Sequence, residues 1–130
     1  MGGVNRCYVN KVIKRKMIRI YGIKNCDTIK KTLRWMIDNR IEYQFHDYKT
    51  LGVDIDILER FIKKFGLETV LNTKSRTWKE LTEKERPKSE KEAIDLMRKK
   101  TSIIKRPIID GKNIQLLGFD LEKFKETFGK

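Results

Sequence analysis

A strand–helix–strand pattern over residues 17–47 constrains the fold of this chain more than any other feature. Residues 17–21 alternate and are rich in isoleucine, which is typical of a strand. From Asp27, the expected cap, a helix is predicted to about Asn39, and residues 41–47 predict a second strand. Such a unit requires a right-handed crossover and parallel pairing. The apolar helix positions expected to face inward are Ile29, Leu33, Met36 and Ile37.

A cysteine lies where this first helix begins. Cys26 stands between Gly22, which ends the strand, and Asp27. The unpaired N–H groups of a helix N-terminus carry about half a positive charge, which favours a thiolate over a thiol. Lys24 and Lys30 add to this effect, whereas Asp27 opposes it. We therefore expect a moderately lowered pKa for Cys26; the alternative is an inert cysteine at a strand end.

The middle of the chain is predicted to be helical. One apolar face, closed by Gly66, holds Leu58, Phe61, Ile62 and Phe65. The spacings at Thr77–Glu80 and Ser89–Glu92 are those of capping boxes, and Pro87 separates the two expected helices. Residues 71–76 form a polar loop before them, which is long enough to carry function.

The pattern returns to strand after residue 102. Residues 103–117 are largely apolar and contain Asp110–Gly111, a signal for a hairpin turn. A last helix is expected to be capped by Asp120. Its apolar side holds Leu121, Phe124 and Phe128. The predicted order is therefore βαβ, several helices, then ββα.

The composition limits the class of protein. A chain of 130 residues suits one domain with its own core. No apolar run approaches the roughly 20 residues of a membrane span, and no signal peptide is evident, so we expect a cytoplasmic protein. Two cysteines make no disulfide framework, and His46 is the only histidine, so neither a metal site nor a bound cofactor is expected. His46 itself is expected to be structural.

The net charge of +13 raises the possibility of nucleic-acid binding. Residues 1–16 contain basic side chains and no acidic one, whereas later charges alternate in sign, as on a solvated helix face. Nucleic acid is therefore not an expected partner. Residues 1–16 are either a basic extension or lie upstream of a native start at Met17, and we favour the second, with a domain over 17–130. Cys7 is expected to have no catalytic role.

Several short strings occur in a characteristic order. They are YGIKNCDT at 21–28, LNTK at 71–74 with WKEL at 78–81, KRPI at 105–108, and LGF at 117–119. Together they resemble the arsenate reductase (ArsC) family, most closely its YffB branch and more distantly the regulator Spx.

This resemblance implies an α/β fold. The family has a thioredoxin-like βαβ…ββα core with a mixed sheet, and a helical insertion that corresponds here to about residues 51–100. The family proline, matched by Pro107, is usually cis and places the preceding residue, here Arg106, next to the thiol.

The resemblance also implies a chemistry. The cysteine that matches Cys26 attacks an oxyanion or a disulfide, and glutathione or glutaredoxin completes the cycle. Arg106 would hold the anionic substrate beside the sulfur. Because Ile29 occupies the position of the second cysteine in a CxxC motif, an external thiol must resolve the intermediate. A monothiol cycle in a monomeric enzyme is therefore expected.

Further residues are expected to bind the substrate or glutathione. They are Lys24, Asn25, Thr28, Asn72, Lys74 and Pro107. Arsenate reductases place several arginines around the oxyanion, but Asn72 stands where one of them would align, so efficient arsenate reduction is not expected. Trp78 is expected to pack, and Arg76 could add positive charge. The alternative function is a non-catalytic, Spx-like regulator that binds RNA polymerase or another protein.

Overall fold

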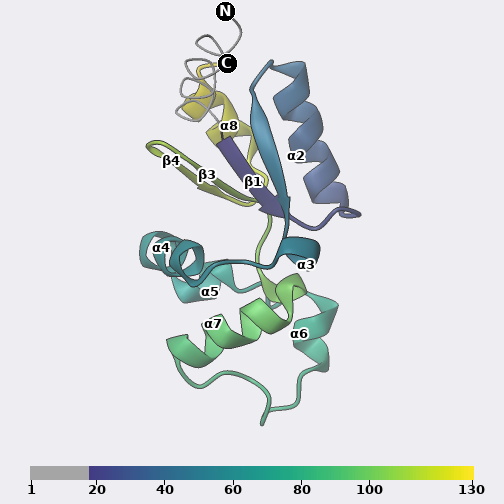
Figure 1. The fold of residues 1–130 in the computed structure, drawn as a ribbon, viewed down its shortest axis with the longest axis vertical. Coiled ribbons are helices and arrows are strands. Elements are labelled where there is room, and N and C mark those ends of the chain that lie inside the picture. The colour runs from purple at the N-terminus through teal and green to yellow at the C-terminus, as the bar shows by residue number, and fades with distance from the viewer. Residues whose placement is uncertain (1–17) are drawn as a thin grey trace, which may run out of the picture.

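The predicted strand–helix–strand unit is present. In the computed structural model, β1 (Ile18–Gly22) runs parallel to β2 (Tyr43–Asp47), and α2 (Asp27–Asp38) connects the two strands (Figure 1). The structure describes residues 18–130. The expectations for residues 1–16, including Cys7, lie outside the described residues.

The C-terminal hairpin completes the sheet. β3 (Ile108–Gly111) pairs antiparallel with both β1 and β4 (Ile114–Leu117), so the described strands lie in the order β2-β1-β3-β4. The hairpin expected from Asp110–Gly111 is present, but both residues belong to β3, where Asp110 pairs with Gln115 and Gly111 with Ile114. The chain instead turns after Gly111, where Asn113 adopts a φ of 61°. With α8 (Leu121–Phe128), this mixed sheet confirms the thioredoxin-like α/β class.

The start and the inner face of α2 differ from the prediction. Cys26 is the cap in place of Asp27, which is the first helical residue. Ile37 is 62% exposed, whereas Thr32 is fully buried. The Thr32 hydroxyl can be buried because it donates a hydrogen bond of 2.8 Å to the carbonyl oxygen of Thr28, one turn earlier.

Between β2 and β3 the chain forms helices that lie beyond one end of the sheet (Figure 1). They are α3 (Tyr48–Leu51), α4 (Ile55–Phe65), α5 (Leu67–Val70), α6 (Arg76–Glu80) and α7 (Glu90–Lys99), followed by a 3-10 turn (Thr101–Ile103). Ser89 caps α7 as predicted, but Ser75 caps α6 in place of Thr77, since its hydroxyl accepts from the backbone N–H of Trp78. Across residues 18–130, no helix has the length and apolar character needed to cross a membrane.

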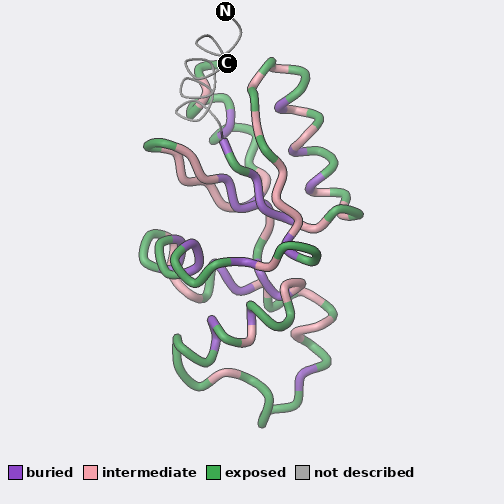
Figure 2. Tube along the Cα trace, viewed as in Figure 1, coloured by how far each residue is buried: buried purple, intermediate pink, exposed green. Residues whose placement is uncertain are grey.

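Two apolar clusters share the sheet (Figure 2). One joins β1 and β3 to α2 and α8 through Ile18, Ile20, Ile109, Met36 and Phe124. The other begins at the neighbouring strand residues Tyr21 and Ile108 and continues through Tyr48, Leu58, Phe61, Ile104 and Met97. Asp120 caps α8 as expected, although Leu121 is 38% exposed and lies outside both clusters.

Two neighbouring residues of α2, one buried and one exposed, test which face of this helix packs on the sheet. Met36 has no exposed surface, so Met36→Ala should lower the free energy of unfolding by about 2–5 kcal/mol. Ile37→Ala, the matched control at a 62% exposed position, should change it by less than about 0.5 kcal/mol. Urea denaturation followed by circular dichroism measures both values. Equal losses would show that α2 is rotated about its axis relative to this structure.

Candidate functional site

Cys26 is held at the end of β1 by the close approach of that strand to α2. The side chain of Ile29 occupies the space that a Cβ atom on Gly22 would need, so only glycine fits at this strand end without displacing Ile29. Ile29 is itself 1% exposed. The chain then turns into α2 at Cys26, whose thiol is free and partly buried. The sulfur therefore sits at a rigid junction and stays in contact with solvent.

Backbone hydrogen bonds bring the segment before Pro107 to the same place. The N–H of Asn72 donates to the Ile103 carbonyl at 2.7 Å, and the N–H of Lys105 donates to the Val70 carbonyl at 2.8 Å. This pairing fixes residues 103–105 against residues 70–72. The Arg106–Pro107 bond is cis, as the family resemblance implied.

The Arg106 guanidinium meets the sulfur directly. Its Nε–H donates to Cys26 Sγ at 3.3 Å, and its Nη1 donates to the carbonyl oxygen of Ser102 at 3.1 Å. The second bond fixes the orientation of the planar group. Because a guanidinium has five N–H donors, others are left for a bound anion.

The surroundings of Cys26 favour its ionised form. Partial burial of the sulfur raises the pKa, but the hydrogen bond from Arg106, the backbone N–H groups of Ile29 and Thr28 and the charge of Arg106 together lower it by more. The pKa of Cys26 therefore lies below that of an ordinary cysteine. The backbone contribution is that of the α2 N-terminus, where unpaired N–H groups stabilise negative charge.

A cavity of about 370 Å³ opens in front of this sulfur. Its lining includes four residues predicted from the sequence: Cys26, Thr28, Asn72 and Arg106. Of the other predicted binding residues, Lys24, Asn25 and Lys74 are exposed and do not line it, and Pro107 is buried beside it. Their assignment to binding is untested, but the cavity gives no support to Lys24, Asn25 or Lys74.

The remaining lining residues were not predicted. They are Lys31, Lys105 and Phe119. Lys31 follows Thr28 by three positions, which places both on one face of α2, and this spacing is a signal that the sequence already contains. Phe119 reaches the cavity because Gly118 adopts a φ of +82°, which turns the chain from β4 towards α8.

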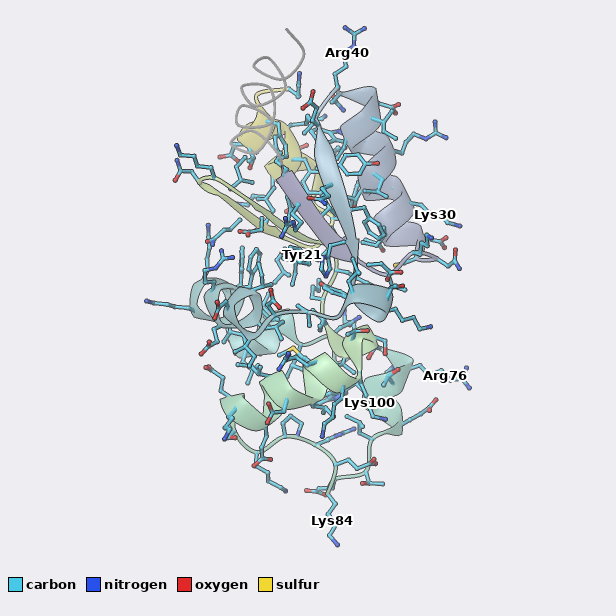
Figure 3. The ribbon with its side chains drawn as sticks, in the orientation of Figure 1. Tyr21, Lys30, Arg40, Arg76, Lys84 and Lys100 are labelled. Atoms are coloured by element: carbon cyan, nitrogen blue, oxygen red, sulfur yellow. The ribbon has the colours of Figure 1, made fainter. Side chains whose placement is uncertain are left out.

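Other residues considered from the sequence lie elsewhere. Arg76 points into solvent and pairs with Glu80 at 2.9 Å (Figure 3). His46 lies 2.7 Å from the Gly52 carbonyl through Nε2 and packs against Tyr21, so its role is structural. Trp78 packs against the second apolar cluster, as expected.

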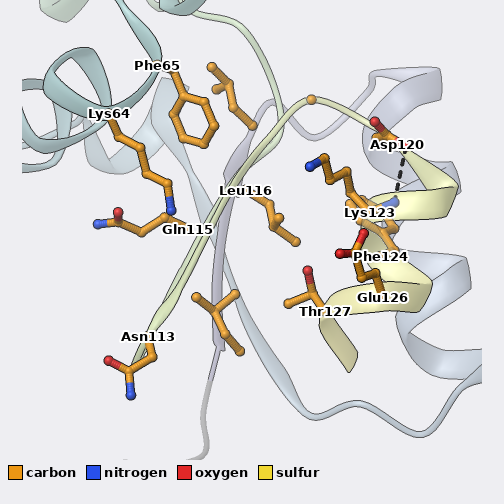
Figure 4. Close-up of a pocket in the computed structure, with 13 residues that line it drawn as sticks. Lys64, Phe65, Asn113, Gln115, Leu116, Asp120, Lys123, Phe124, Glu126 and Thr127 are labelled. Atoms are coloured by element: carbon orange, nitrogen blue, oxygen red, sulfur yellow. Dashed lines mark hydrogen bonds between the residues drawn. The ribbon is translucent and has the colours of Figure 1, made fainter. Parts of the chain in front are cut away.

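A second hollow of about 460 Å³ lies between β4 and α8, beside the end of α4 (Figure 4). Its lining includes Lys64, Phe65, Gln115 and Lys123 and has no cysteine among the described residues. Within residues 18–130, no group of three or more metal-binding side chains comes together. The cavity at Cys26 is therefore the candidate functional site.

Known proteins resemble the chain along most of its length. An uncharacterized protein from Haemophilus influenzae is 40% identical over 115 residues, covering 86% of this chain and 99% of that protein. The global transcriptional regulator Spx of Streptococcus pyogenes is 23% identical over 111 residues, covering 84% of this chain and 83% of Spx.

Solved structures also resemble the chain along most of its length. A protein called YFFB is 37% identical with a TM-score of 0.79, covering 84% of this chain and 96% of YFFB. An arsenate reductase (ArsC) related protein from Brucella melitensis is also 37% identical, with a TM-score of 0.66, covering 88% of this chain and 96% of that protein. The ArsC family model matches residues 21–127, a span that contains the Cys26 cavity. The chain belongs to the ArsC family.

Proposed function

We propose that this protein is a glutathione-dependent thiol oxidoreductase in which Cys26 is the nucleophile. The observation that carries the proposal is the 3.3 Å contact between Arg106 Nε and Cys26 Sγ at the mouth of a solvent-accessible cavity. A thiol reaction needs an ionised, reachable sulfur and a positive group for the anionic substrate. Membership of the ArsC family supports the broader assignment to thiol oxidoreductase chemistry.

The first step is thiol–disulfide exchange. The Cys26 thiolate attacks a disulfide between glutathione and a substrate thiol. The disulfide bond breaks, the substrate sulfur leaves as a thiolate and takes a proton from water, and Cys26 is joined to glutathione. Arg106 stabilises the thiolate before the attack and lies next to the incoming anionic group.

The second step returns the sulfur to its reduced form. A glutathione thiolate attacks the mixed disulfide, so oxidised glutathione leaves and the Cys26 thiolate is restored. An external thiol takes this role because Ile29, which packs against Gly22, occupies the position of the second cysteine of a CxxC motif. Two glutathione molecules, one in the substrate disulfide and one free, leave as the oxidised dimer.

Arsenate is a weaker candidate substrate. The lining of the cavity includes one arginine, Arg106, and Asn72 stands where the family resemblance would align another. Planar guanidinium groups match a doubly charged tetrahedral ion better than an amide does. We therefore expect disulfide substrates to react faster than arsenate.

The regulator alternative is supported by the similarity to Spx at 23% identity. It requires binding to a protein partner and no turnover at Cys26. Catalytic reduction of a disulfide that depends on Cys26 therefore separates it from the proposed function.

The pKa of Cys26 tests the role of Arg106. Iodoacetamide reactivity of the wild type, in a Cys7→Ser background, should show an inflection below about pH 8.5, the value of a free cysteine. Arg106→Met removes the hydrogen bond and the positive charge but leaves the burial, so the pKa should rise and less thiolate should form at neutral pH. Arg34→Met, which removes an exposed cation two turns into α2 and outside the cavity, is the control and should leave the profile unchanged.

The lowered pKa also predicts how stability depends on pH. A group with a lower pKa in the folded state stabilises the protein above its unfolded pKa and loses this effect as the pH falls through the folded pKa. The free energy of unfolding of the wild type, relative to Cys26→Ser, should therefore increase from acidic to mildly alkaline pH. A flat difference would contradict preferential stabilisation of the thiolate.

Turnover tests the proposed function itself. With a glutathionylated peptide and excess glutathione, the wild type should release the free peptide thiol, and Cys26→Ser should reduce the rate to the uncatalysed background. Arg106→Met should lose about 10- to 100-fold in kcat/KM, since one charge-assisted hydrogen bond contributes about 1.5–3 kcal/mol. Parallel assays with arsenate measure the substrate preference. Turnover that persists in Cys26→Ser would reject this sulfur as the nucleophile.

A further inference from the structure

Three cationic side chains converge on the Cys26 cavity. Arg106, Lys31 and Lys105 all line it, and no acidic residue is among its described lining. Neither lysine has an ion-pair partner in the part of the chain that the structure describes. Two N–H groups of Arg106 already bind Cys26 and Ser102, whereas the ammonium groups of the two lysines make no ion pair and add positive charge to the same cavity.

Lys31 is held in place by an aromatic ring. Its Nζ atom lies 5.1 Å from the centroid of the Phe119 ring, a cation–π distance. Phe119 in turn meets the buried Phe124 edge to face, with ring centroids 5.2 Å apart. The cation–π contact thus weakly favours a position of the exposed ammonium group next to a ring that packs on the core.

The side chain of Lys105 passes close to the backbone of Gly118. Its Cε atom lies 3.2 Å from the position that a Cβ atom on Gly118 would occupy, so the stem of the lysine lies close over this glycine. The backbone of Lys105 is fixed by its hydrogen bond to Val70. The turn at Gly118–Phe119 thus lies next to both lysines at the cavity.

We infer that Lys31 and Lys105 form a carboxylate-binding pair that selects thiols with two carboxylate groups. This inference rests on the proposed function and deepens it. The pair would bind the carboxylates of the glutathione that attacks the disulfide on Cys26, while Arg106 stabilises the Cys26 sulfur. Charge recognition by exposed lysines is weak for each contact, so we expect about a three- to fivefold effect for each lysine, reduced by salt.

Glutathione and its diethyl ester provide the sharpest comparison, because the ester keeps the peptide but removes both negative charges. In a Cys7→Ser background, Cys26 is first converted to its mixed disulfide with thiopyridine. Each thiol then attacks this disulfide and releases thiopyridone, which is followed by its absorbance. Dividing each rate by the same thiol's rate with dithiodipyridine removes differences in intrinsic reactivity.

The wild type should prefer glutathione to the diethyl ester. Lys31→Gln and Lys105→Gln should each reduce this preference by about three- to fivefold, with little change in the rate of the ester. Lys30→Gln is the matched control, since it removes the same charge from the adjacent position of α2 without touching the cavity, and it should keep the preference.

The possible failures have different meanings. Equal rates for the two thiols in the wild type, or an unchanged preference in both lysine variants, would overturn the carboxylate-binding pair and leave Cys26 reactivity intact. Loss of the preference to the same extent in Lys30→Gln would assign it to net charge and also overturn the pair. If Cys26 forms no mixed disulfide at all, the proposed function fails with it.

Discussion

The contact between the Arg106 guanidinium and the Cys26 sulfur joins residues that are 80 positions apart in the sequence. It depends on the register of the sheet, in which Tyr21 on β1 pairs with Ile108 on β3. That pairing brings the residues after β1 and the residues before β3 to the same edge. A shift of one residue would also turn Ile20 and Ile109 away from α2 and α8, so the apolar core fixes the register and thereby the site.

Local patterns predicted the elements of the fold well but were less successful at their ends. The alternation of β1, the helical spacing of α2 and the caps at Ser89 and Asp120 are short-range signals, and the structure confirms them. The Asp110–Gly111 signal predicted the hairpin, but both residues still pair with β4, and the Asp110 carboxylate binds Arg60, fifty residues away. Such long-range contacts leave no trace in the spacing of neighbouring residues.

The same distinction applies to the site. Cys26 and Arg106 could be proposed from short strings that resemble a family, and the structure places them in contact. The spacing of Thr28 and Lys31 places Lys31 on the cavity face of α2, but the contact of Lys31 with Phe119 joins distant parts of the chain and has no local signal. The same holds for Lys105, whose side chain lies close to Gly118 across the hairpin.

The groups that lower the pKa of Cys26 also affect how readily its sulfur leaves a disulfide. A sulfur that is stable as an anion departs easily from a disulfide, because the rate of exchange rises as the leaving thiol becomes more acidic. The donors around Cys26 are supplied by the fold and are present whether the sulfur is free or bound. An attacking thiol should therefore displace Cys26 from a mixed disulfide more readily than it displaces an ordinary cysteine.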